Sequence, residues 1–90
     1  MEKEVIELLQ REIAEIEEQL GQKIASWKVM KDEYEAWCRE RRGEYGDSVA
    51  DDELEWERGA SVREYHRMYI EPLEDLLADK RRDLKLFRGR

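Results

Sequence analysis

The sequence predicts an all-α fold, an antiparallel helical hairpin that dimerises into a four-helix bundle, and three observations support this fold class. Two long stretches carry hydrophobic residues in alternating steps of three and four, and an acidic segment separates them. Residues 1–20 carry seven acidic and two basic residues, whereas residues 80–90 carry six basic residues and one acidic residue. Opposite charges at the two ends of the chain indicate that these ends lie side by side.

Composition limits the chain to one domain, residues 1–90. A chain of 90 residues buries only a modest part of its surface, so it benefits from association. Charged residues make up 46% of the sequence and hydrophobic residues 40%, a combination typical of long helices and coiled coils. Three Trp and four Tyr supply the apolar area that disordered segments lack.

The first helix is expected over residues of about 3 to 42. With Ile6 at heptad position a, hydrophobic residues continue through nearly five heptads, which predicts a coiled-coil seam. Lys23 occupies the one seam position that is not hydrophobic. The seam consists of Ile6, Leu9, Ile13, Ile16, Leu20, Trp27, Met30, Tyr34 and Trp37.

An acidic connection is expected over about 43–51, where Gly43 and Gly46 allow the chain to reverse. Two starts are open for the second helix. Asp51 or Asp52 could cap a helix that begins at once, or a capping box over residues 61–64 could follow a break at Gly59.

The second helix is expected over about 52–88. Its seam is interrupted by Arg63, His66 and Lys80, and it is widened at position g by Val62, Tyr69 and Leu76. Pro72 removes a backbone donor, so we expect a kink or a helix boundary near residues 70–72. The seam positions are Ile70, Leu73, Leu77, Leu84 and Phe87.

The two seams match when residue i of the first helix meets residue 93−i of the second. This register places Ile16 opposite Leu77 and Leu20 opposite Leu73, each pairing an a with a d position, as in antiparallel coiled coils. Further hydrophobic residues lie off the seam, which favours a homodimer. They are Val5, Leu8, Ile24, Val29, Met68 and Leu86.

The residue pattern predicts no catalytic, metal or cofactor site. The register places His66 beside Trp27 and Cys38 near Glu55, so the single histidine and the single cysteine do not form a dyad. No Glu-x-x-His motif of the kind found in di-metal bundles is present. We therefore expect a protein that is not an enzyme and uses no cofactor.

The acidic stretch around Trp56 is the candidate partner-binding site. Residues 43–58 carry seven acidic residues and one arginine, while Arg39, Arg41 and Arg42 of the first helix are expected to face solvent. A Trp among carboxylates is typical of a contact for a basic protein surface. The alternative is a Trp56 that folds back onto the end of the bundle. The predicted contact residues are Asp51, Asp52, Glu53, Glu55, Trp56 and Glu57.

These features predict a non-catalytic protein-interaction or assembly module. The alternative is an acidic inhibitor that mimics nucleic acid, of the small phage accessory type. A net charge of −7 disfavours direct binding to nucleic acid or to an anionic membrane. The acidic N-terminus, the absence of a long apolar run and the single cysteine lead us to expect a cytoplasmic protein.

Overall fold

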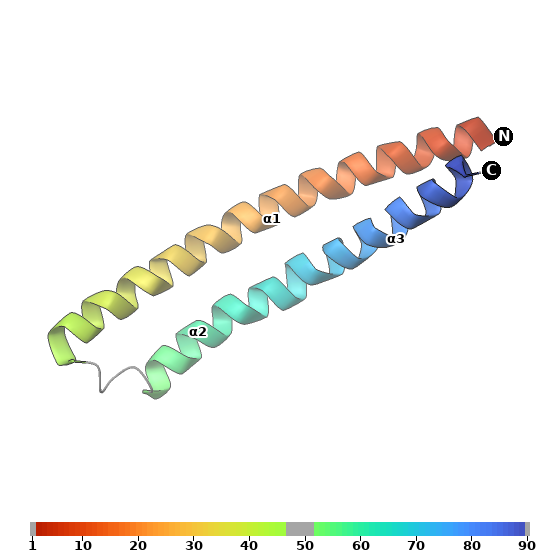
Figure 1. The fold of residues 1–90 in the computed structure, drawn as a ribbon. Helices are drawn as coiled ribbons and strands as arrows, with labels where there is room; N and C mark the ends of the chain where they lie inside the picture. The colour runs from red at the N-terminus through yellow and green to blue at the C-terminus, as the bar shows by residue number, and fades with distance from the viewer. Residues whose placement is uncertain (1, 47–51, 90) are drawn as a thin grey trace.

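The protein is an antiparallel helical hairpin (Figure 1). The computed structural model describes residues 2–46 and 52–89. Helix α1 spans Glu2–Tyr45, and the returning arm consists of α2 (Glu53–Tyr65), a π-helical turn η2 (His66–Ile70) and α3 (Glu71–Arg88). The rod measures 65 × 17 × 16 Å, and both termini lie at one end. The predicted hairpin is therefore confirmed.

The observed contacts follow the predicted register closely. Arg41 pairs with Asp52, and the ring centres of Trp27 and His66 lie 4.9 Å apart, both as the 93−i register requires. Toward the termini the ion pairs depart from this register. Lys80 Nζ lies 2.7 Å from a carboxylate oxygen of Glu12, one position away from the ideal register.

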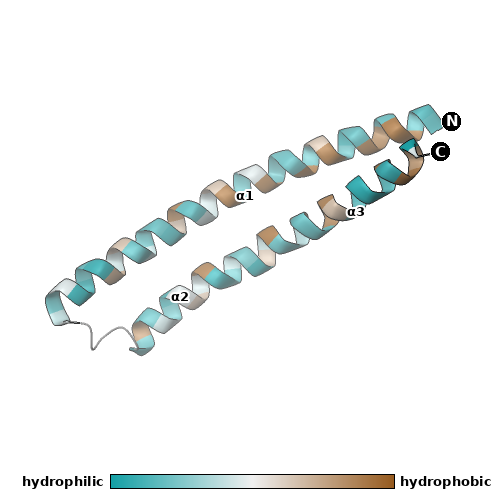
Figure 2. Ribbon diagram, viewed as in Figure 1, coloured by the Kyte–Doolittle hydropathy of each residue, from teal (hydrophilic) through white to brown (hydrophobic). Residues whose placement is uncertain are grey.

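The half of the hairpin near the termini has an aliphatic core. Buried Ile13, Ile16 and Leu77 form this core, with Leu20, Leu73 and Leu84 packed around it. The most hydrophobic segments of Figure 2 accordingly lie in the terminal half, while the half near the turn is paler.

Ion pairs border this aliphatic core, as the opposite charges of the two ends predict. Lys80 interrupts the seam, and its side chain reaches out to Glu12, whose carboxylate raises the pKa of the lysine. Arg81 Nη2 donates to Glu17 Oε1 at 2.9 Å. Both side chains of this second pair are about half exposed, so it contributes little to stability.

The π turn shifts the heptad by one residue, and the heptad spacing did not predict this shift. The N–H of Glu71 donates to the carbonyl of His66, five residues earlier. In a continuous α-helix the phase set by Ile70 would place Arg63 in the seam and Val62 on its flank. Instead Val62 is buried and Arg63 is exposed. The wider turn accommodates one extra residue, so the seam steps back from Ile70 to His66 and then to Val62.

Pro72 gives a physical reason for a π turn at this position. Its nitrogen cannot donate to the carbonyl of Met68, and its ring crowds that carbonyl in a regular α-helix. The π turn ends two residues before Pro72, so the irregular hydrogen bonding lies where the proline disturbs the helix. Gly59, by contrast, lies inside α2, and the helix continues through it.

Helix α1 extends further than the expected end near residue 42. Gly43 is helical and does not take part in the reversal, which corrects its predicted role. Among the described residues Gly46 alone has a positive φ, +83°, and its N–H donates to the carbonyl of Arg42 at 2.8 Å. This arrangement is a left-handed C-terminal cap, for which glycine is favoured because it has no Cβ. Residues 47–51, including the predicted contact residue Asp51, lie outside the described residues.

Most of the off-seam hydrophobic residues remain on the surface. Exposure is 50% for Leu8, 57% for Val29 and 62% for Leu86, whereas Ile24 is half-buried. The homodimer and the four-helix bundle that these residues favour remain predictions.

We predict that Gly59→Ala destabilises the protein although alanine favours helices. A Cβ at Gly59 would lie 2.8 Å from Tyr34 Oη and 3.1 Å from its Cζ, so the phenol must move. Overpacking of this kind costs about 1–3 kcal/mol. Gly21→Ala is the matched control, because that position has nothing within 4 Å and should gain up to about 1 kcal/mol. Urea unfolding followed by circular dichroism measures both, and equal gains at the two glycines would contradict the packing.

We predict that deletion of Met68, an exposed residue of the π turn, makes the returning arm a regular helix and leaves the face that α2 presents to α1 unchanged. Val62 would then lie seven residues before Ile70, two turns of a regular helix, so Glu55 and Val62 would stay in the seam. Hydroxyl-radical footprinting should show a Trp56 as reactive as in the full-length chain, with unchanged helix content. A shielded Trp56 would show that the π turn does not contain the extra residue.

Candidate functional site

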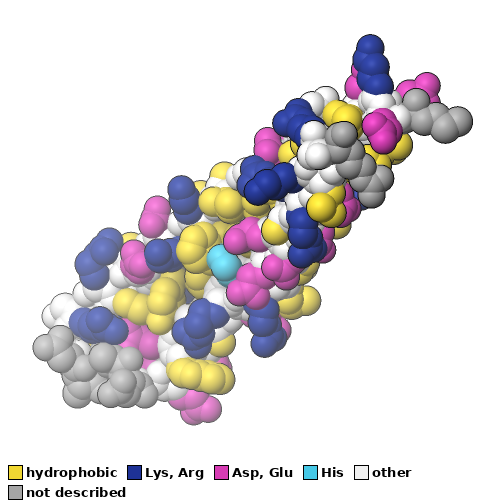
Figure 3. Space-filling view, turned by 45° about the vertical axis from the view of Figure 1, so that its right-hand side comes forward, with side chains coloured by type: hydrophobic (Ala, Val, Ile, Leu, Met, Phe, Trp, Pro, Cys, Tyr) yellow, Lys and Arg dark blue, Asp and Glu magenta, His cyan; other side chains and the backbone are white. Residues whose placement is uncertain are grey.

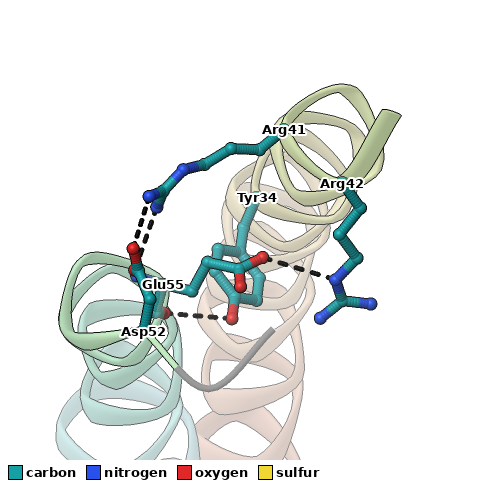
Figure 4. A network of polar contacts seen from close by, with 5 residues as sticks. All are labelled: Tyr34, Arg41, Arg42, Asp52 and Glu55. Carbon is teal, nitrogen blue, oxygen red and sulfur yellow. Dashed lines mark hydrogen bonds and ion pairs between the residues drawn. The ribbon is translucent and has the colours of Figure 1, made fainter. Parts of the chain in front are cut away.

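The turn end of the hairpin is held together by polar contacts that join the two arms (Figure 4). The guanidinium of Arg41 contacts the Asp52 carboxylate through both terminal nitrogens, and Nη1 donates to Oδ1 at 3.0 Å. Asp52 also caps α2, because its Oδ1 accepts from the N–H of Glu55 at 3.0 Å. Arg41 and this backbone N–H hold the pKa of Asp52 below its usual value.

Glu55 is a buried carboxylate at the same end. Its side chain is only 2% exposed, and Arg42 Nε lies 3.5 Å from Oε1. Neither carboxylate oxygen has a hydrogen-bond partner within residues 2–46 and 52–89. The backbone carbonyl of Glu55 accepts from Tyr34 Oη at 3.1 Å, which ties α2 to the last third of α1. Burying a carboxylate that has only one distant cationic partner costs free energy. The Arg42–Glu55 pair therefore fixes the geometry more than it stabilises the fold.

Cys38 lies next to this carboxylate, as the register predicts, and is buried. Burial and the neighbouring Glu55 raise the pKa of the Cys38 thiol. A neutral, inaccessible thiol is a poor nucleophile. Cys38 therefore belongs to the packing of the turn end.

The structure corrects the predicted partner-binding site in two ways. Asp52 and Glu55 face the other arm and are occupied by Arg41 and Arg42, two arginines that were expected to face solvent. Glu55 lies in the seam because the phase shift at the π turn moves it there from a flanking position. Asp52 and Arg41 occupy positions d and a of the predicted heptads, so their pairing follows from the register itself.

Glu53, Trp56 and Glu57 remain on the surface, and we call these three residues the acidic Trp patch. Their spacing of three and four residues places them on one flank of α2. The Trp56 side chain is 66% exposed. It makes no hydrogen bond or ring contact with the described part of the chain, so its indole is available to a partner.

The opposite flank of α2 is covered differently. Leu54 and Trp56 are two residues apart, about 200° around the helix, and so point to opposite sides. On the Leu54 side the guanidinium of Arg58 lies 4.1 Å from the centre of the Trp37 ring. The guanidinium of Arg41, which belongs to α1 as Trp37 does, lies 5.2 Å from the same ring centre. These cation–π contacts leave Trp37 partly buried, as expected for its seam position.

An aromatic groove of about 530 Å³ runs along the hairpin on the flank that carries Arg63. Trp27, Tyr34, Val62 and His66 line it, and Trp27 Nε1 donates to the Val62 carbonyl at 3.2 Å. Figure 3 shows a face on which the histidine, in cyan, lies between hydrophobic and acidic side chains. Its ring nitrogens lie 3.7 Å and 4.0 Å from carboxylate oxygens of Glu71 and Glu74.

Basic side chains predominate at the rim of this groove. Lys31, Arg63 and Arg67 line it, together with the acidic Glu35 and Glu71. Lys31 Nζ lies 5.2 Å from the centre of the Trp27 ring. Such a groove can hold an apolar or aromatic group that carries negative charge beside it.

The groove was not predicted from the sequence, although the register contained a sign of it. Residue 34 meets residue 59 in the 93−i register, so a tyrosine faces a glycine across the seam. Gly59 leaves the space that the phenol occupies, as the 2.8 Å clash of a Cβ there indicates. Large aromatic side chains opposite a residue without a side chain do not fill the space between the two arms evenly. The unfilled part of that space is the groove.

Comparison with known proteins adds no functional assignment. No protein-family model, curated protein or solved structure matches the chain. Within the described residues no group of three or more His, Cys, Asp and Glu side chains could hold a metal ion. None of the helices in that part of the chain combines the length and apolar character needed to cross a membrane.

We predict that Asp52→Asn lowers stability at neutral pH and flattens its dependence on acid pH. Asparagine caps helices as well as aspartate, so the variant removes only the charge. Because the pKa of Asp52 is lowered in the folded state, its contribution is present above the usual value of 3.8 and is lost as pH falls below it. Urea unfolding between pH 2 and 7 measures this, with Asp32→Asn, an exposed position on α1, as control. Identical pH profiles for the two variants would contradict the assignment.

Proposed function

We propose that the protein is a non-catalytic protein-interaction module that binds a basic protein surface through the acidic Trp patch. The observation that carries this proposal is the 66% exposure of Trp56 beside Glu53 and Glu57, whose carboxylates form no ion pair with the described residues. Exposing an indole to water is costly, and Trp is the residue most enriched among interface hot spots. Carboxylates on either side favour a basic partner and disfavour others.

The ion pairs that join the two arms at the turn end support this proposal. Asp52 and Glu55, one residue before and two residues after Glu53, are held by Arg41 and Arg42. The first turn of α2 is therefore fixed against α1, and Trp56 occupies a defined position before a partner arrives. A preorganised contact loses less conformational entropy on binding.

The charge pattern of the long sides favours this module over a mimic of nucleic acid. Several acidic side chains are neutralised within the hairpin, as in the pairs of Glu12 with Lys80 and Glu17 with Arg81. On the face in Figure 3 basic and acidic side chains are interspersed. A nucleic-acid mimic needs a continuous acidic surface to replace the phosphate backbone.

We predict that the combined change Glu53→Lys, Trp56→Ala and Glu57→Lys weakens partner binding at least tenfold, since a hot-spot Trp alone contributes about 2 kcal/mol or more. Asp52 is kept because it braces the turn. The partner is first identified by capture from the native host on immobilised protein, and its affinity is then measured by calorimetry. Affinity for the unchanged protein should also fall as salt rises above about 0.1 M.

The matched control is Leu54→Ala with Arg58→Ala on the opposite flank of α2, which should bind the partner as well as the unchanged chain. Circular dichroism checks that both variants keep their helix content. Undiminished binding by the patch variant, together with loss of binding after charge reversals spread over residues 2–18, would contradict the module and favour the acidic mimic.

A further inference from the structure

We propose that a second copy of the chain fills the aromatic groove, each copy inserting its acidic Trp patch into the groove of the other. This inference rests on the acidic Trp patch of the proposed function and names one partner for it. The same molecule carries both an exposed indole between carboxylates and an aromatic groove with a basic rim. The two surfaces match in both polarity and charge.

Most charges of the two surfaces have no ion-pair partner among the described residues of one copy. Among the described residues Lys31 and Arg63 form no ion pair, and neither do Glu53 and Glu57. Arg67 reaches only Glu64, at 3.9 Å, with both side chains largely exposed. Such an exposed pair is weak, so Arg67 can exchange it for another carboxylate. Three basic groups of the groove are thus available to two carboxylates of the patch.

One copy cannot fill its own groove. Trp56 and the groove residue Val62 belong to the same helix, six residues or about 9 Å apart along its axis. Regular helix fixes that separation, and the indole points outward, as its exposure of 66% records. The occupant must therefore come from another molecule.

The positions of patch and groove allow a closed dimer. Trp56, Ala60 and Arg63 follow one another at i, i+4 and i+7, so patch and groove lie on the same flank of α2. When Trp56 of each copy meets Val62 of the other, the two α2 helices run antiparallel and the twofold axis passes near Gly59 and Ala60. Ala60 has a small side chain, which permits close approach of the helices. The contact is the same on both copies, so it closes at two.

This dimer differs in shape from a side-by-side four-helix bundle. The helical arm from Ala60 to Arg88 is about 42 Å long, and the two copies extend from the axis in opposite directions, giving about 84 Å in total. A side-by-side bundle formed through Leu8, Val29 and Leu86 would keep the 65 Å length of one hairpin. X-ray scattering in solution distinguishes the two lengths.

The decisive test reverses the charges of each surface separately. The patch variant carries Glu53→Lys and Glu57→Lys, and the groove variant carries Arg63→Glu and Arg67→Glu. Each variant alone places like charges at both contacts, so its dimer dissociation constant should rise at least tenfold in analytical ultracentrifugation. In an equimolar mixture, both contacts join opposite charges again, and heterodimers should form with an affinity near that of the unchanged protein.

Three results would overturn the inference: an unchanged protein that is monomeric at every concentration tested, variants that dimerise as well as the parent, or a mixture that stays monomeric. Circular dichroism excludes unfolding, and Trp56→Ala, which keeps all charges, should independently weaken the dimer. Failure here is distinct from failure of the proposed function. A monomer that still binds a basic partner through Trp56 contradicts only this inference, whereas a dimer whose partner binding ignores Trp56 contradicts only the proposed function.

Discussion

The arrangement of the turn end depends on one extra residue in the returning arm. An α-helix keeps a hydrophobic stripe on one face only while that stripe repeats at close to 3.6 residues. Between Val62 and Ile70 the seam takes two steps of four, which would carry it off the face in a regular helix. The π turn at His66–Ile70 contains the additional residue and returns the stripe to the interface. Every residue of α2 is thereby rotated relative to the heptad set by α3.

That rotation determines which residues meet the partner arm and which meet solvent. It places Glu55 and Val62 in the seam, and it turns Trp56 and Arg63 outward. The Arg42–Glu55 pair, the acidic Trp patch and the rim of the groove are therefore three consequences of the same local change. Backbone irregularities of this type are frequent at functional sites, where they reorient side chains that a regular helix would bury.

The two halves of the hairpin are stabilised by different interactions. Near the termini, aliphatic residues such as Ile16 and Leu77 pack in the ordinary coiled-coil manner. Near the turn, hydrogen bonds from Trp27 and Tyr34 to carbonyls of α2 and the pair of Arg41 with Asp52 replace aliphatic contacts. Polar contacts contribute less free energy than aliphatic burial, but they tolerate only one register. The terminal half thus supplies stability, and the turn half supplies the alignment that positions Trp56.

The sequence was sufficient to predict the hairpin and its register. Heptad spacing and opposite terminal charges each depend on many residues, so one irregularity does not hide them, and the register even placed His66 beside Trp27. The inward position of Glu55 could not be predicted, because counting heptads assumes a constant number of residues per turn. Only Pro72 indicated a disturbance, and a proline marks where a helix is irregular without specifying a π turn or a kink. The groove was missed for a related reason, since Val62 had been assigned to the flank.

A single patch that serves both a second copy and another protein has a thermodynamic consequence. The two proposed partners contact Trp56 and therefore exclude each other, so binding of one lowers the apparent affinity for the other. Well below the dissociation constant of the dimer, nearly every copy would present its patch. Well above it, a competing partner must first separate two copies, and its apparent affinity falls as the concentration of the chain rises. The pair of Arg42 with Glu55 acts on both equilibria equally, because it holds α2 in place whichever partner is bound. Weakening the Arg42–Glu55 pair should therefore reduce both affinities together, whereas changes at Arg63 and Arg67 should reduce only self-association.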